Sequence, residues 1–77
     1  NNFYVPDDEL AVQVSYSISD PETLRRESDA LGKLPQVCPC RRRVIITYDE
    51  EGSSEDSYGT IAFVPAWKWL LEEDNNR

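Results

Sequence analysis

The sequence contains no histidine, no methionine, and only two cysteines and three glycines among its 77 residues. Without histidine, neither a Ser-His-Asp triad nor a Cys-His pair can form. The three glycines are too scattered to make a glycine-rich phosphate loop, so the sequence contains no ATP-binding motif of that kind. We therefore predict no cofactor within this chain, and no finished catalytic constellation.

The two cysteines, Cys38 and Cys40, are separated only by Pro39, a spacing too short to cross-link a fold. They predict neither a disulfide framework nor a secreted compartment. A tetrahedral zinc site needs four ligands, and the chain has no histidine and no second cysteine pair to complete one. We expect a turn with two free thiols in a reducing cytoplasm; an intermolecular zinc site and a thiol switch are the other interpretations.

Long apolar runs are also absent. None approaches the roughly 18 residues that a membrane-spanning helix requires, so we expect a soluble protein. The sequence opens on asparagine, with no initiator methionine and no apolar signal segment. These features favour a single domain, residues 1–77 with an ordered core of about 3–72, excised from a larger protein. A chain this short buries only about 60% of the surface that its unfolded form exposes.

Basic residues are few. Fifteen Asp and Glu stand against eight Lys and Arg, which gives a formal net charge of −7. A surface this negative repels phosphate backbones, so nucleic-acid binding by the chain is not expected. The one basic cluster, Arg41-Arg42-Arg43, precedes an apolar strand and is interpreted as a solubilising guard of that strand, with phosphate or partner contact as the alternative. The acidic charge leaves open a role as a docking surface for a basic protein.

Residues 10–18 alternate in a period of two, which is typical of a strand with one apolar face. That predicted face carries Leu10, Val12, Val14, Tyr16 and Ile18. A shorter strand at Phe3–Val5 precedes it, and Pro6 followed by three acidic residues supplies turn chemistry. The two strands should form an antiparallel hairpin.

A helix is predicted after residue 20, because Asp20 can cap it and Pro21 suits its first turn. Leucines at helical spacing continue to a predicted end near Gly32 to Leu34, where Pro35 disfavours further helix. The apolar strand 43–48 that follows reads as central and covered on both faces. A strand, a helix and a strand make a βαβ unit, so strands 10–18 and 43–48 should be parallel.

The rest of the chain is predicted as an acidic, serine-rich mobile loop over Asp49–Gly59, a strand over Thr60–Val64, and a helix from Pro65 to Glu72. The predicted fold is therefore a small α/β (α+β) domain with a mixed sheet and the element order β-β-α-β-β-α. The direction of the strand at 60–64 stays open.

Three groups of residues are candidate sites. Asp7 and Asp8 form a carboxylate cluster that hard cations prefer, although aspartates in turns more often bond nearby backbone. Gln13 and Ser15 share the polar face of a strand, but no base accompanies Ser15 to make it a nucleophile. Trp67 and Trp69 lie two apart on the last helix and face different directions. Trp69 is the candidate for a partner contact, and a half-buried core tryptophan is the other interpretation.

Several strings in the chain resemble one family. They are residues 10–18 (LAVQVSYSI), Glu22-Thr23, Arg26-Glu27, Ala30-Leu31, residues 44–51 (VIITYDEE) and residues 64–71 (VPAWKWLL). Together they resemble the C-terminal region of bacterial AAA-type ATP-binding proteins common in Bacteroidetes. The resemblance covers residues 2–72.

In that family the C-terminal region looks like a restriction-endonuclease-like, PD-(D/E)xK fold, so the resemblance implies a truncated core of this kind. The family pattern has an acid on the first strand and Glu-x-Lys on the second, which hold a divalent metal and support the attacking water. Placed on this sequence, those positions fall at or near Asn2 and on Gln13 and Ser15. All three residues depart from the pattern.

A neutral amide cannot replace a carboxylate as a charge-balancing metal ligand, and a serine cannot replace an ammonium group. The resemblance therefore implies a degenerate, non-catalytic interaction or regulatory module of a cytoplasmic ATPase. Its partners would be the rest of the ATPase chain or another protein, and ATP and Mg²⁺ would bind only to the ATPase part. The alternatives are a nuclease in which Asp7 or Asp8 joins Gln13 to hold metal, and an acidic docking module.

Overall fold

The computed structural model describes residues 2–75 of the chain. Five strands and two α-helices follow one another, with short 3-10 turns at Pro6–Asp8 and Leu34–Gln36: β1 (Asn2–Val5), β2 (Leu10–Val14), α1 (Pro21–Lys33), β3 (Arg42–Thr47), β4 (Gly52–Asp56), β5 (Gly59–Pro65) and α2 (Ala66–Asn75). The strands form one sheet in the order β1-β2-β3-β5-β4. The predicted mixed sheet of a small α/β domain is confirmed.

The pairing of the first half follows the sequence pattern. β1 and β2 form the expected antiparallel hairpin. β2 and β3, which precede and follow α1 in the chain, pair in parallel. Asp20 caps α1 by accepting a hydrogen bond from the backbone N–H of Thr23 at 3.1 Å, and Pro21 occupies the first turn. β5 also runs parallel to β3, which settles the direction that the sequence left open.

The predicted acidic loop was wrong over half its length, because residues 52–56 form the edge strand β4, antiparallel to β5. The observed order is thus β-β-α-β-β-β-α. β4 and β5 join through two residues, and Gly59 has a φ of +113°, a conformation that side chains disfavour. The strand is polar on both faces, as edge strands often are, so it lacks the apolar alternation that marks a half-buried strand.

Two further boundaries moved. β2 ends at Val14 rather than at residue 18, and Ile18 packs with the α1-side core instead of the face that carries Val12. Pro65 is the last residue of β5 rather than the first of the helix. The last helix, predicted to end at Glu72, extends to Asn75 as α2, and residues 76 and 77 lie outside the described part of the chain.

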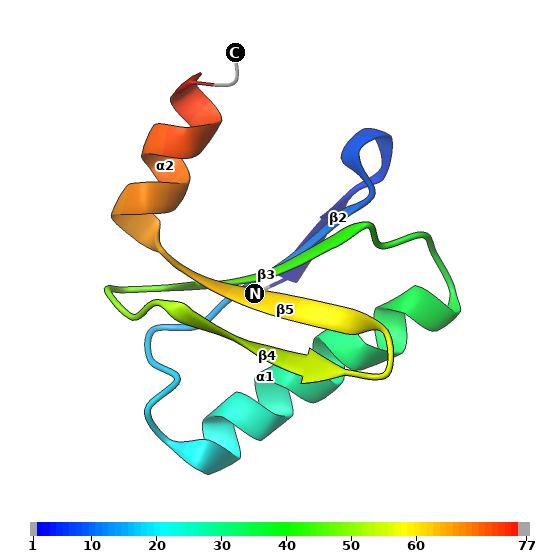
Figure 1. The fold of residues 1–77 in the computed structure, drawn as a ribbon, viewed down its shortest axis with the longest axis horizontal. Coiled ribbons are helices and arrows are strands. Elements are labelled where there is room, and N and C mark those ends of the chain that lie inside the picture. The colour runs from blue at the N-terminus through cyan, green and yellow to red at the C-terminus, as the bar shows by residue number, and fades with distance from the viewer. Residues whose placement is uncertain (1, 76–77) are drawn as a thin grey trace.

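The sheet carries an apolar cluster on each face, and β3 contributes to both, as a central strand should. Ile45 packs toward α1 with Ala11, Leu31, Ile61 and Phe63. Val44 and Ile46 pack on the other face with Leu10, Val12 and Val64. Figure 1 shows α1 lying along one side of the sheet, while α2 leaves the end of β5 on the other side and projects beyond the sheet. No helix within residues 2–75 is long and apolar enough to cross a membrane.

Candidate functional site

The three positions that the family resemblance singles out meet at one corner of the sheet. The register of the β1–β2 hairpin pairs Asn2 directly with Gln13, and directly opposed residues of an antiparallel pair point to the same face. Ser15 follows the end of β2, where its N–H donates to the carbonyl of Ile46 at 2.8 Å and continues the pairing with β3. Strand alternation places Gln13 on the same face as Ala11, which packs toward α1.

A fourth residue, Glu27 of α1, completes this corner. The Gln13 side-chain N–H (Nε2) donates a hydrogen bond to the Glu27 carboxylate, and Gln13 is only 7% exposed. Arg26 places its Nε 4.0 Å from the other carboxylate oxygen of Glu27. The Glu27 carboxylate thus has one hydrogen-bond donor and one more distant cation within the chain itself.

Glu27 was not among the predicted site residues, although the sequence contains a signal for it. Leu24, Glu27 and Leu31 are spaced i, i+3 and i+7, which puts them on one face of a helix. Leu24 and Leu31 both pack into the α1-side core. A charged residue between two inward-facing leucines has to point toward the sheet, where it needs a hydrogen-bond donor.

Two buried side-chain oxygens have no partner among the described residues. Gln13 Oε1 and, one turn of helix away from Leu24, Ser28 Oγ are buried and accept no hydrogen bond from the described residues. The Ser15 hydroxyl donates to the carbonyl of Ser17 at 3.2 Å. The corner formed by Asn2, Gln13, Ser15 and Glu27 therefore offers one carboxylate, two amides and one hydroxyl. It has no basic side chain aimed at Ser15, so it lacks the partner that nucleophilic attack requires.

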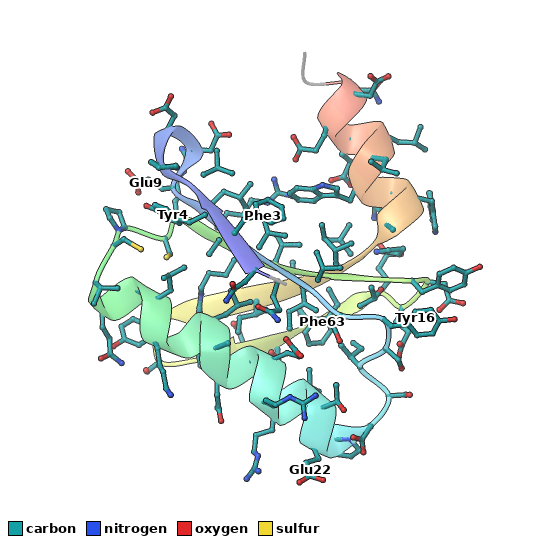
Figure 2. All side chains as sticks on the ribbon, turned by 180° about the vertical axis from the view of Figure 1, so that it is seen from behind. Phe3, Tyr4, Glu9, Tyr16, Glu22 and Phe63 are labelled. Carbon is teal, nitrogen blue, oxygen red and sulfur yellow. The ribbon has the colours of Figure 1, made fainter. Side chains whose placement is uncertain are left out.

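The other predicted metal candidates lie elsewhere. Asp7 and Asp8 form the 3-10 turn that closes the β1–β2 hairpin, whereas Asn2 and Gln13 pair at its opposite end. In Figure 2, Glu9 marks the turn, and Tyr16, two residues beyond the end of β2, lies on the other side of the molecule. Within residues 2–75, no three His, Cys, Asp or Glu side chains gather as a metal site would need. The structure does not bring Asp7 or Asp8 to Gln13.

The three adjacent arginines have different environments. Arg43, predicted at the surface, is only 3% exposed, and its guanidinium donates two hydrogen bonds to Asp56, at 2.8 and 2.7 Å, and one to the Leu31 carbonyl at 3.4 Å. It cannot be the proposed surface guard or partner contact, because a charge this buried needs its internal partners. The same hydrogen bonds lower the pKa of Asp56 to about 2 and raise that of Arg43.

Arg41 and Arg42 remain at the surface, as predicted. Arg41 donates to the backbone carbonyl of Asp8 at 3.3 Å. Arg42 lies over the ring of Trp69, 5.6 Å from its centroid, and 3.8 Å from the Glu72 carboxylate. A cation over an aromatic face is an attractive pair, so Arg42 helps to hold α2 against the sheet.

The two tryptophans do face different directions. Trp69, the predicted partner contact, packs against the core cluster of Leu10, Val12, Val44, Ile46 and Val64. Trp67 points outward and is 58% exposed. The tryptophan available to a partner is therefore Trp67.

The two cysteines lie between α1 and β3 as free thiols, both partly exposed. Each bonds to a nearby carbonyl: Cys38 to that of Leu34 and Cys40 to that of Cys38, both at 3.5 Å. Burial, with the nearby Cys38 as a second cause, raises the pKa of the Cys40 thiol. A raised pKa keeps Cys40 protonated at neutral pH, which makes it less reactive than an ordinary thiol.

Comparisons of the chain with protein-family models, with curated proteins and with solved structures found no match.

Proposed function

We propose that this chain is a non-catalytic interaction or regulatory module with a nuclease-like arrangement, belonging to a bacterial AAA-type ATPase. In this proposal the module is cytoplasmic, and the ATPase part of the protein binds ATP and Mg²⁺. The basis for the ATPase is the sequence resemblance alone. The basis for the loss of catalysis is the corner formed by Asn2, Gln13, Ser15 and Glu27.

The observation that carries the proposal is the hydrogen bond from the Gln13 amide to Glu27. A metal-dependent nuclease needs carboxylates directed at a cation, which then activates water. In the placement that the resemblance implies, the Gln13 amide stands where the Glu-x-Lys pattern has its glutamate, and its N–H donates a hydrogen bond to Glu27, the acid that the described residues bring to this corner. A neutral amide and a single, already bonded carboxylate hold a divalent cation poorly.

The nuclease alternative needs Asp7 or Asp8 beside Gln13, and the hairpin holds them at opposite ends. The alternative of an acidic docking module has an observation in its favour. The carboxylates of Glu73 and Asp74 lie beside the exposed apolar side chains of α2. A docking role and the loss of catalysis are compatible, so the same chain can have both properties.

The test combines cleavage and binding. The chain is incubated with supercoiled plasmid and either Mg²⁺ or Mn²⁺, and amide chemical shifts are followed during titration with each cation and then with a short DNA duplex. We expect an uncut plasmid and no saturable shifts at Gln13, Ser15 and Glu27. Cleavage that disappears in Glu27→Gln, while the exposed-site control Glu22→Gln retains it, would overturn the proposal.

A further inference from the structure

Helix α2 is apolar on two sides, and only one of them is covered. On the inner side, Ala66 and Trp69 pack against the sheet. On the outer side, Trp67, Leu70 and Leu71 are 58%, 67% and 58% exposed. Figure 1 shows why the outer side is free, since α2 projects from the end of β5 beyond the sheet.

The three outer residues form one continuous stripe rather than scattered exposures. Positions i, i+3 and i+4 of a helix are neighbours on its surface, and Asp74 continues the stripe at i+7. Trp67, Leu70 and Leu71 line a single hollow together with Glu73 and Asp74. Isolated exposed leucines are ordinary on any protein, but contiguous large apolar side chains with a polar rim mark an interaction surface.

The charge around the stripe restricts what can cover it. Two carboxylates, Glu73 and Asp74, border the hollow. The basic residue of α2, Lys68, already bonds to Glu51. A second copy of the chain, at a net charge of −7, would bring the same carboxylates to the contact and repel. A partner with lysine or arginine beside its apolar side chains fits instead.

We propose that the outer face of α2 binds a basic amphipathic helix of another protein. This face is made by Trp67, Leu70, Leu71, Glu73 and Asp74. A stripe with apolar anchors at i, i+3 and i+4 and a carboxylate at i+7 is a geometry that one helix presents to another. The aromatic anchor is Trp67, because tryptophans at the centre of an apolar contact dominate binding. This inference rests on the proposed interaction function and names the surface and the partner chemistry.

The probe is a synthetic amphipathic helix of about 14 residues, with leucine on one face and lysine on the other, titrated into the ¹⁵N-labelled 77-residue chain. A peptide with glutamate in place of lysine is the matched control. We expect saturable amide shifts confined to residues 66–75 with the lysine peptide, weakening as salt is added, and none with the glutamate peptide. Equal binding of both peptides would contradict the charge argument.

Paired variants locate the contact. The double variant Trp67→Ala, Leu70→Ala should weaken binding about tenfold or more. Because both side chains are exposed, the variant should remain folded, as judged from its amide spectrum. Glu73→Gln with Asp74→Asn should weaken it several-fold, whereas Asp7→Asn with Asp8→Asn, which changes net charge equally, should leave it unchanged. Equal weakening by both charge pairs would mean nonspecific attraction, and concentration-dependent self-association abolished by the Trp67 and Leu70 substitutions would mean a second copy; either overturns the proposal.

The two proposals fail separately. Absent peptide binding with an uncut plasmid removes this surface and leaves the non-catalytic module standing. Plasmid cleavage that depends on Glu27 removes the non-catalytic function, whatever the peptide does at α2.

Discussion

Replacing Asp56 by asparagine measures how strongly the buried guanidinium of Arg43 depends on its carboxylate. The Arg43 side chain is 2% exposed and that of Asp56 is 32% exposed, so the pair lies at the edge of the core. The pKa of Asp56 falls from 3.8 to about 2, mainly through the hydrogen bonds from Arg43. A shift of this size corresponds to at most about 2 kcal/mol, and partial exposure reduces the expected stabilisation to about 1–2 kcal/mol.

The pH dependence has a definite sign. A carboxyl group whose pKa is lower in the folded state stabilises the fold above its unfolded pKa, and that stabilisation disappears as the pH falls through the folded pKa. The difference in unfolding free energy between the native chain and Asp56→Asn should therefore be full at pH 7 and shrink between pH 4 and pH 2, the window set by the two pKa values of Asp56. Other carboxyl groups cancel in the difference, because both proteins share them.

The assay is urea unfolding followed by tryptophan fluorescence at pH 7 and at a series of acidic pH values. Arg43→Met serves as the matched variant. It leaves a carboxylate that water can reach and puts an apolar side chain in the buried position, so it should cost less than Asp56→Asn, which strands a buried charge. A difference for Asp56→Asn below about 0.3 kcal/mol at pH 7, or one that does not change with pH, would refute the ion-pair reasoning.

Three further predictions concern other parts of the fold. Asp20→Ala should lower the melting temperature by several degrees, because the Asp20 side chain accepts hydrogen bonds from Thr23 at the start of α1. Asp20→Asn, which can still cap the helix, should keep most of the native stability. Equal melting curves for Asp20→Ala and the native chain would show that the cap is dispensable. Ile45→Val should cost about 0.5–1.5 kcal/mol and Ile45→Ala about 2–5 kcal/mol in urea unfolding, since Ile45 is fully buried in the central strand; a negligible cost of the alanine variant would contradict the central position. Gln13→Glu should destabilise the chain by about 1–3 kcal/mol at pH 7 through repulsion with Glu27, with recovery as acid lets the two carboxyl groups share a proton; Gln13→Met, which adds no charge, should show no such recovery.

Much of the fold follows from local patterns. The cap at Asp20 and the proline after it locate the start of α1, and an apolar run covered on both faces identifies β3 as a central strand. Once a helix lies between two strands, parallel pairing of β2 and β3 is the expected outcome, and the register confirms it. These elements were predictable because their residues carry strong signals at the right period.

β4 was not predictable in this way. Glycine, serine and acidic residues have low strand propensity, and an edge strand with two wet faces has no apolar alternation. Its order comes from the hairpin with β5 and from the ion pair of Asp56 with Arg43, which lies 13 residues earlier in the sequence. An ion pair of this kind leaves no trace in a local window.

The error over β4 explains the error over Arg43. With residues 49–59 taken as a mobile loop, Asp56 had no fixed place, and Arg43 had no visible partner to justify burial. A strand directs successive side chains to opposite faces, so within one arginine run Arg42 turns to Trp69 and Arg43 turns to Asp56. The first contact holds α2 by its Trp69 side and thereby leaves Trp67, Leu70 and Leu71 outward. The core of this domain already uses the inner tryptophan, whereas the outer stripe belongs to neither core cluster of the described residues, and this exposure is the ground on which we propose it as a binding surface.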